Sequence, residues 1–236
     1  MIQECLILAG GFGTRLRSIV SNVPKPMALI QGKPFLEYLL KYLSSQGITK
    51  VVLSVGYLRE KIINYFGKHF AGMEIVYSIE DEPLGTGGAI LKAKALLGEA
   101  FFIVNGDTLF KLKFSELYEF FKQKEADIVL ALKPMKNCER YGSVEIDANG
   151  RVIGFVEKAK LKDCLINGGV YVVSNKVLTT DFTKDFQAPF SWERDFLERR
   201  YKELKIYGLV CDGYFIDIGT PEDYKRAIHE LKGYFK

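Results

Sequence analysis

Short apolar runs alternate with amphipathic stretches along the first half of the chain. The runs 4–10 (ECLILAG) and 50–57 (KVVLSVGY) are largely apolar, which predicts strands buried on both faces. Between them, 35–47 (FLEYLLKYLSSQG) repeats apolar residues at helical spacing and ends on a glycine, which predicts a helix. The same reasoning predicts strands at 73–81, 100–107 and 127–135 and helices at 59–70, 86–98 and 114–126.

The pattern changes at about Met135. Two short strands around Ala148-Asn149-Gly150, within 141–158, predict a hairpin. Further strands are predicted at 165–174 and twice within 205–220, and helices at 190–201 and 220–235. Strands joined by helices predict an α/β fold: a single Rossmann-like, three-layer domain over 1–236 with a mostly parallel mixed central sheet. We expect a nucleotide-binding half at about 1–134 and a small, β-rich, sugar-phosphate-binding half at about 135–236.

Composition narrows the class of protein. The chain is 48% hydrophobic and 26% charged, as soluble globular domains are, and has no apolar run long enough to cross a membrane. We expect a cytoplasmic protein. A net charge of +4 suits small anionic substrates and not nucleic acid. Two histidines and four scattered cysteines favour neither a catalytic triad, a zinc site nor a disulfide framework.

A glycine-rich loop follows the first predicted strand. Gly10, Gly11 and Gly13 let backbone N–H groups approach an anion closely, although such glycines also serve plain strand-to-helix turns. The dinucleotide fingerprint fails because Leu16 stands where a small residue is needed, and no P-loop pattern is present.

Two basic residues near this loop favour a phosphate site. Arg15 offers a planar fork of donors, and Lys25 is a compact charge between Pro24 and Pro26, which stiffen the backbone. A solvated lysine in a proline turn is the alternative.

The stretch LAGGFGTRL…PKPM (8–27) resembles the signature of sugar-nucleotide pyrophosphorylases, the nucleotidyltransferases that act on sugar 1-phosphates. EPLGTGGA (82–89) is similar to the family segment that lies against the nucleobase, and its glycines would leave backbone groups open to approach. The resemblance implies catalytic roles for Arg15, Lys25 and Asp107. It implies nucleotide binding by Leu8, Ala9, Gly10, Gly11, Gly13, Thr14, Arg15, Lys25, Leu84, Gly85, Thr86, Gly87 and Gly88.

Two aspartates follow predicted strands. Magnesium prefers one or two carboxylates together with phosphate oxygens and water. The resemblance implies that Asp107, in VNGD, and Asp217, in DIGT, hold Mg2+. A helix-capping role is the alternative for Asp107. On the sugar side, the resemblance implies binding of the sugar phosphate by Gly142, Glu157, Lys158, Asn167 and Gly168, each of which could also be an ordinary hairpin or strand-end residue.

The implied reaction joins a nucleoside triphosphate and a sugar 1-phosphate and releases pyrophosphate. VSNVPKPMALIQGKPFLEYLL, FSWERDFLE and YFIDIGTPEDYKRA are most similar to D-glycero-D-manno-heptose 1-phosphate guanylyltransferases, which make GDP-heptose from GTP for capsule and related polysaccharides. Mannose 1-phosphate guanylyltransferases and other hexose 1-phosphate nucleotidyltransferases are alternatives. A non-catalytic nucleotide-sugar-binding regulator is an alternative from another class. A homodimer is common among such enzymes. The mild net charge and the lack of a long apolar run indicate no nucleic-acid or membrane partner.

Overall fold

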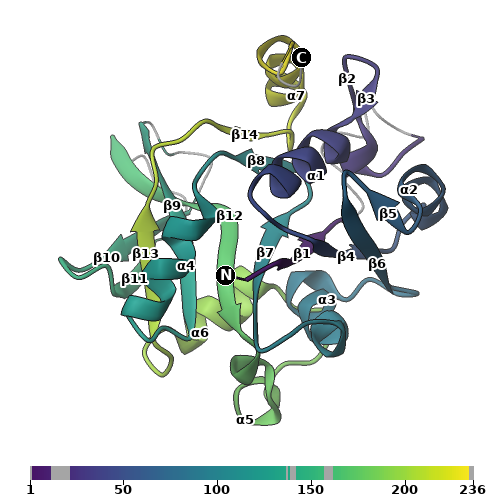
Figure 1. Cartoon of the computed structure of the whole chain (residues 1–236). Helices are drawn as coiled ribbons and strands as arrows, with labels where there is room; N and C mark the ends of the chain where they lie inside the picture. Colours follow the sequence, from purple (N-terminus) through teal and green to yellow (C-terminus); the bar gives the residue numbers. More distant parts are fainter. Residues whose placement is uncertain (1, 12–21, 137, 139–141, 157–161, 234–236) are drawn as a thin grey trace.

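A ten-stranded mixed sheet runs through the computed structural model, which describes residues 2–11, 22–136, 138, 142–156 and 162–233. Four parallel strands form its centre, in the order β7 (Ala100–Asn105), β1 (Glu4–Leu8), β4 (Lys50–Val55) and β6 (Met73–Ile79). Figure 1 shows these strands side by side in the middle of the molecule. The predicted α/β fold with a parallel sheet centre is confirmed.

Both faces of this sheet are buried. Along β1, Cys5 and Ile7 join one hydrophobic cluster and Leu6 joins the other, and all three are fully inaccessible to solvent. Alternate side chains of a strand point to opposite faces, so a strand covered on both sides must be apolar throughout. The sheet is therefore the middle of three layers, as the apolar runs predict.

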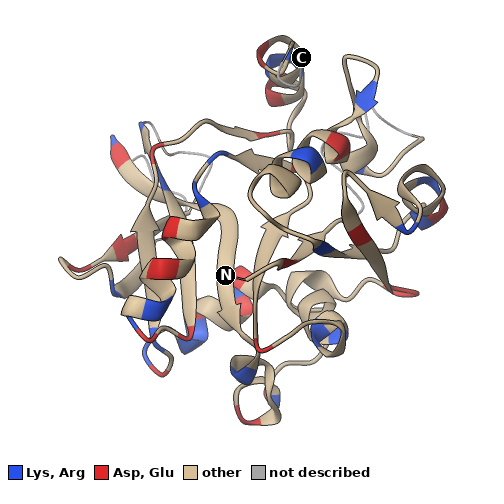
Figure 2. Cartoon of the chain, viewed as in Figure 1, with Lys and Arg blue, Asp and Glu red and all other residues tan. Residues whose placement is uncertain are grey.

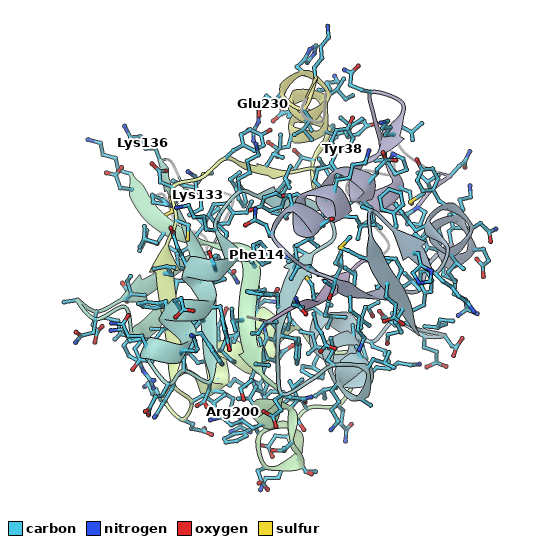
Figure 3. The ribbon with its side chains drawn as sticks, viewed as in Figure 1. Tyr38, Phe114, Lys133, Lys136, Arg200 and Glu230 are labelled. Atoms are coloured by element: carbon cyan, nitrogen blue, oxygen red, sulfur yellow. A yellow bond between two sulfur atoms is a disulfide. The ribbon has the colours of Figure 1, made fainter. Side chains whose placement is uncertain are left out.

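Helices supply the two outer layers. One cluster contains residues of α1 (Phe35–Ser45), α2 (Arg59–Phe66), α4 (Phe114–Gln123) and α7 (Pro221–Glu230). The other contains residues of α3 (Gly85–Ala93) and of a π-helix at Trp192–Leu197, which α6 (Glu198–Arg200) follows. Phe114, labelled in Figure 3, packs edge-on against the ring of Phe102 in the sheet. Short helical segments also lie at Lys25–Met27, Lys94–Leu96, Asn175–Leu178 and α5 (Thr180–Thr183).

Two helix predictions differ from the structure in more than the length of the helix. The helix predicted over 59–70 ends at Phe66, because Gly67 adopts a φ of 59° and β5 (His69–Phe70) pairs with β6. The helix predicted over 190–201 begins as the π-helix at Trp192–Leu197. π-helical turns are rare and are frequently found at functional sites.

The second half of the chain extends the sheet with antiparallel pairs. The long strand β12 (Asp163–Ser174) pairs with β7 and with β9 (Ile128–Lys136), and β13 (Ile206–Val210) lies parallel to β9. β10 (Ser143–Ile146) and β11 (Val152–Val156) form the predicted hairpin. The ladder of β12 with β9 is interrupted between Asn167 and Tyr171.

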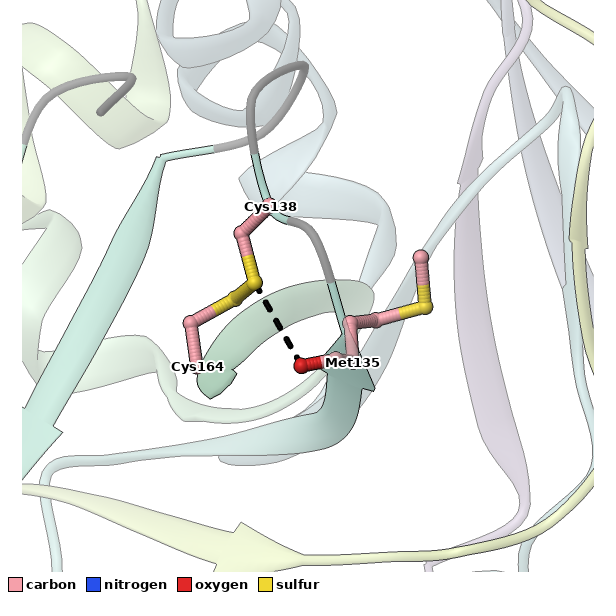
Figure 4. Close-up of a disulfide and its surroundings, with 3 residues drawn as sticks. All are labelled: Met135, Cys138 and Cys164. Carbon is pink, nitrogen blue, oxygen red and sulfur yellow. Dashed lines mark hydrogen bonds between the residues drawn. A yellow bond between two sulfur atoms is a disulfide. The ribbon is translucent and has the colours of Figure 1, made fainter. Parts of the chain in front are cut away.

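A disulfide joins Cys138 to Cys164, contrary to the expectation of no disulfide pairing. Cys164 lies opposite Met135 in the β9–β12 ladder, so the chain leaving β9 brings Cys138 within a Cα–Cα distance of 6.3 Å. Figure 4 shows the pair beside the Met135 carbonyl, whose oxygen lies 3.4 Å from Cys138 Sγ. Spacing along the sequence could not reveal the pair, because a strand register creates it.

Two short ladders lie outside the main sheet. β8 (Thr108–Phe110) pairs with β14 (Phe215–Asp217) in an antiparallel register that sets Asp217 opposite Thr108. β2 (Leu29–Ile30) and β3 (Lys33–Pro34) form a small hairpin before α1. Figure 1 shows β8 and β14 together at one end of the main sheet, near α7. Within the described residues, no helix is long and apolar enough to cross a membrane.

Candidate active site

The carboxyl ends of β1 and β7 open into a cavity of about 390 Å³. Ligands of open α/β sheets bind at this edge. The Gly106 N–H donates to the Leu8 carbonyl at 3.0 Å, which joins the two strand ends and brings Asp107 beside the first loop. Of the predicted site residues, the cavity is lined by Leu8, Ala9, Gly11, Lys25, Asp107, Asn167, Gly168 and Asp217.

Lys25 and the two predicted metal ligands form one charged cluster in this cavity. The Lys25 ammonium donates to Asp107 Oδ2 and lies 3.7 Å from Asp217 Oδ1. Only 15% of the Lys25 side chain is exposed. Lys25 opens a short helical turn between two buried prolines, Pro24 and Pro26, so its backbone is constrained as the sequence predicts. The structure thus brings Asp107 next to Lys25, which lies 82 positions earlier in the chain, and next to Asp217, which lies 110 positions later.

Asp217 is held by local backbone. The Gly219 N–H donates to Asp217 Oδ1 at 2.7 Å, and the Ile218 N–H donates to the Asp107 carbonyl at 3.0 Å. Burial, and then the negative charge of Asp107, raise the pKa of Asp217, while the Lys25 ammonium opposes the increase. A Cβ at position 219 would lie 2.8 Å from Asp217 Oδ1, so the site requires a glycine there.

This donor set fits a divalent cation that shares its coordination with a substrate. Asp107 and Asp217 bring two carboxylates to one ammonium, and a partly buried pair of like charges favours a cation nearby. The described residues contain no cluster of three or more His, Cys, Asp or Glu side chains that could hold a metal. Mg2+ is usually bound by one or two carboxylates together with phosphate oxygens and water, and not by a cage of protein ligands alone. The two carboxylates of this cavity fit that mode of binding.

Sequence reasoning missed Asn105, which ends β7 and also lines the cavity. Its Oδ1 atom is buried and has no hydrogen-bond partner within the described part of the chain. Gly169, with a φ of 70°, lies so close that a Cβ would be 2.7 Å from Asn105 Nδ2. The signal was present in the sequence, since Asn105 precedes Asp107 by two positions at the same strand end.

The glycines of EPLGTGGA have a packing role that the sequence did not predict. Phe190 packs onto them: Cβ atoms would lie 2.3 Å from its carbonyl oxygen at Gly85 and 2.1 Å from its ring at Gly87. The Gly87 N–H donates to the Phe190 carbonyl, and the Phe190 N–H donates to Leu84. The expectation that these backbone groups are open is therefore wrong for the Gly87 N–H. Gly88 is buried in the same contact, and Thr86 bonds through its side chain to Glu193.

The remaining predicted residues lie apart from this cavity or outside the described residues. Gly10 borders a neighbouring cavity of about 400 Å³, where the Ser54 hydroxyl donates to the buried Glu80 carboxylate at 2.8 Å. Gly142 is exposed, just before β10. Outside the described residues lie Gly13, Thr14, Arg15, Glu157 and Lys158.

The family model of nucleotidyl transferase matches residues 4–233 of the chain. This chain belongs to the nucleotidyl transferase family. The nucleotidyl transferase is 50% identical over 233 residues to the D-glycero-alpha-D-manno-heptose 1-phosphate guanylyltransferase of Aneurinibacillus thermoaerophilus, covering 98% of this chain and all of that one. It is 48% identical over 224 residues to the enzyme of the same name from Campylobacter jejuni subsp. jejuni, covering 94% and 97%.

A solved structure supports the fold. The crystal structure of HddC from Yersinia pseudotuberculosis complexed with GMP-PN is 36% identical to this nucleotidyl transferase. It has a TM-score of 0.83 and covers 98% of this chain and 100% of that one. The predicted family and the narrower resemblance to heptose 1-phosphate guanylyltransferases are both confirmed. The individual roles of the site residues stay predictions.

Proposed function

We propose that this nucleotidyl transferase moves GMP from GTP to D-glycero-α-D-manno-heptose 1-phosphate, giving GDP-heptose and pyrophosphate. The observation that carries the proposal is the Lys25 ammonium held between Asp107 and Asp217, in a cavity at the carboxyl ends of the parallel strands. Two heptose 1-phosphate guanylyltransferases are 50% and 48% identical to this chain over nearly its full length, which supports the choice of base and sugar.

The reaction needs positioning and charge more than proton transfer. A phosphate oxygen of the sugar 1-phosphate attacks the α-phosphorus of GTP, and the bond from that phosphorus to the bridging oxygen breaks as pyrophosphate leaves. The attacking oxygen is already anionic at neutral pH, so no general base is required. Lys25 would offset the negative charge that grows at the α-phosphoryl group, which is where preorganised charge accelerates a reaction most.

We propose Mg2+ as the divalent cation of this site, with Asp107 and Asp217 holding it. When bound, the cation supplies positive charge against the phosphate oxygens. The protein supplies the rest of the geometry. Asp217 is oriented by the Gly219 N–H, and the backbone of Leu8, Ala9 and Gly11 faces the cavity from the β1 side.

The two substrates would approach the cluster from opposite sides. We place the triphosphate along the loop after β1, with Arg15 on the β- and γ-phosphates. We place the sugar phosphate at β12, where Asn167 and Gly168 line the same cavity as Lys25. Glu157 and Lys158 would complete the sugar-phosphate side.

Pyrophosphate release tests the proposal directly. Purified protein is assayed with Mg2+ and GTP, ATP, CTP, UTP or dTTP, each with heptose, mannose or glucose 1-phosphate. We expect the highest kcat/KM for GTP with D-glycero-α-D-manno-heptose 1-phosphate. Higher turnover with mannose 1-phosphate would reassign the sugar, and activity with dTTP and glucose 1-phosphate would overturn both choices. No release with any pair would favour a nucleotide-sugar-binding regulator.

A further inference from the structure

A chain of side-chain hydrogen bonds connects the sugar side of the cavity to the EPLGTGGA segment. Asn167 Nδ2 donates to the Tyr171 hydroxyl at 2.8 Å, and that hydroxyl donates to Glu193 Oε1 at 3.2 Å. The Thr86 hydroxyl donates to the other oxygen, Glu193 Oε2, at 3.0 Å. Of these four residues, Asn167 lines the cavity. The mechanism above uses neither Tyr171 nor Glu193.

The direction of these bonds is fixed by chemistry. Tyr171 is completely buried, and burial together with the Glu193 charge raises the pKa of its hydroxyl well above the ordinary value, so it stays a phenol. A carboxylate only accepts, so the single phenol proton is committed to Glu193. The Tyr171 oxygen must then accept from Asn167 Nδ2. At its other end, the Asn167 amide oxygen accepts the Gly169 N–H at 3.1 Å.

Both ends of the Asn167 amide are therefore held. One N–H points to Tyr171 and the oxygen takes the Gly169 N–H, so the side chain cannot flip without losing both bonds. The amide has a second N–H to offer a ligand. These contacts span the interruption in the β12 ladder, where β12 forms no register pair with β9 between Asn167 and Tyr171. The side-chain hydrogen bonds therefore hold β12 in place where its backbone pairing with β9 is interrupted.

Glu193 is itself anchored to two elements. Its Oε2 atom accepts hydrogen bonds from Thr86 at the start of α3 and from Ser191, just before the π-helix, at 3.1 Å. Thr86 Oγ1 in turn accepts the Trp192 N–H at 2.8 Å. The carboxylate thus joins the first turn of α3 to the first turn of the π-helix. Any displacement of one segment would shift the oxygen that holds Tyr171.

We propose that Tyr171 and Glu193 are positioning residues, which orient the Asn167 amide toward the sugar phosphate and couple that orientation to the nucleotide-side segment through Thr86. The proposal rests on the proposed function, because it takes Asn167 as a contact of the sugar phosphate and the EPLGTGGA segment as a contact of the nucleotide. Tyr171 acts on the sugar side alone. Glu193 acts on both substrates, since it bonds to both segments.

Steady-state kinetics of Y171F and a double-mutant cycle with N167A test this coupling. Loss of the hydroxyl should raise the KM for heptose 1-phosphate about fivefold, the effect of one net hydrogen bond, and leave the KM for GTP unchanged. In the N167A background, Y171F should have no further effect, because the hydroxyl works through that amide. E193A should raise the KM for both substrates. Y42F, which removes another buried hydroxyl bonded to the Leu112 carbonyl, is the matched control and should leave both KM values unchanged.

Each outcome decides the proposal. An undiminished effect of Y171F in the N167A background, or equal rises in both KM values with Y171F, would overturn it and assign Tyr171 to packing. If Y171F does not fold, E193A replaces it in the test, because Glu193 is only partly buried and its replacement should be tolerated. A rise in the KM of E193A for one substrate alone would overturn the coupling. A silent N167A in an active enzyme would remove the premise about Asn167. An inactive wild-type protein would instead refute the proposed function.

Discussion

Replacement of Lys25 by methionine removes one positive charge and keeps a long, unbranched side chain. In the structure this charge is bonded to Asp107 and lies 3.7 Å from Asp217. At an effective dielectric constant of about 20, a unit-charge pair at this distance is worth roughly 4 kcal/mol of attraction. Removal of the ammonium leaves two facing carboxylates without a cation, which by itself would cost about 3 kcal/mol. Mg2+ held by the same carboxylates would restore that compensation, so we expect the free energy of unfolding measured in Mg2+ to change by only about 1 kcal/mol.

The rate should change far more than the stability. Removal of one charge-stabilising donor from a transition state costs about 10²–10³ in kcat, or roughly 3–4 kcal/mol. The difference arises because Lys25 is already compensated by carboxylates in the folded protein, whereas the α-phosphoryl charge appears only during the reaction. K25M should therefore fold, keep its KM for GTP within about threefold, and lose turnover.

Pyrophosphate release under saturating substrates, together with urea unfolding, separates the two effects. Lys50→Met is the matched control: the Lys50 ammonium lies 3.0 Å from Glu4 Oε1, at the start of β4 and so at the opposite edge of the sheet. It should keep wild-type turnover. A kcat for K25M within about threefold of wild type, a loss below 1 kcal/mol, would refute the role given to Lys25.

Three further predictions follow from the same structure. Asp107→Ala should abolish pyrophosphate release at any magnesium concentration while the circular dichroism spectrum stays unchanged. Gly85→Ala should lower the free energy of unfolding by more than Gly72→Ala, measured in urea: both have positive φ (70° and 78°), but only the Gly85 Cβ would clash with Phe190. Burial raises the pKa of Tyr42 to about 12 in the folded protein. The contribution of this shift to the free energy of unfolding is therefore complete below about pH 10 and is lost as the pH rises through about 12. Between about pH 10 and 12, the free energy of unfolding of Y42F, measured in urea, should fall less than that of wild type.

Each of these has an outcome that contradicts it. Turnover by D107A above a tenth of the wild-type rate would remove Asp107 from the chemistry. Equal destabilisation by G85A and G72A would mean that Phe190 moves aside at little cost. Parallel stability curves for Y42F and wild type between pH 10 and 12 would mean that Tyr42 does not titrate with unfolding.

Local sequence was sufficient where one element determines the outcome. The apolar run of β1 predicted its two buried faces, and Pro24 and Pro26 predicted the stiff turn that presents Lys25. The meeting of Asp107 with Asp217 was anticipated from family motifs, not from spacing. In the structure it depends on the β8–β14 ladder and on the hydrogen bond from Ile218 to Asp107.

Features that depend on long-range packing could not be predicted from local sequence. The Cys138–Cys164 disulfide follows from the register of β9 with β12. The glycines of EPLGTGGA are needed by Phe190, which lies about a hundred positions further along the chain. Local sequence alone could not show that the Gly87 N–H is taken by the Phe190 carbonyl. The same holds for Glu193, whose partners come from two other elements.

The small β8–β14 ladder has a consequence for the order in which a newly made chain becomes functional. Every strand of the main sheet has been synthesised once Val210 has left the ribosome, but Asp217 has not. A nascent chain can thus acquire most of its core while one wall of the cavity, from Phe215 to Gly219, is still missing. Nucleotide transfer therefore depends on residues that are synthesised after the last strand of the main sheet, so the sheet can form before the site is complete.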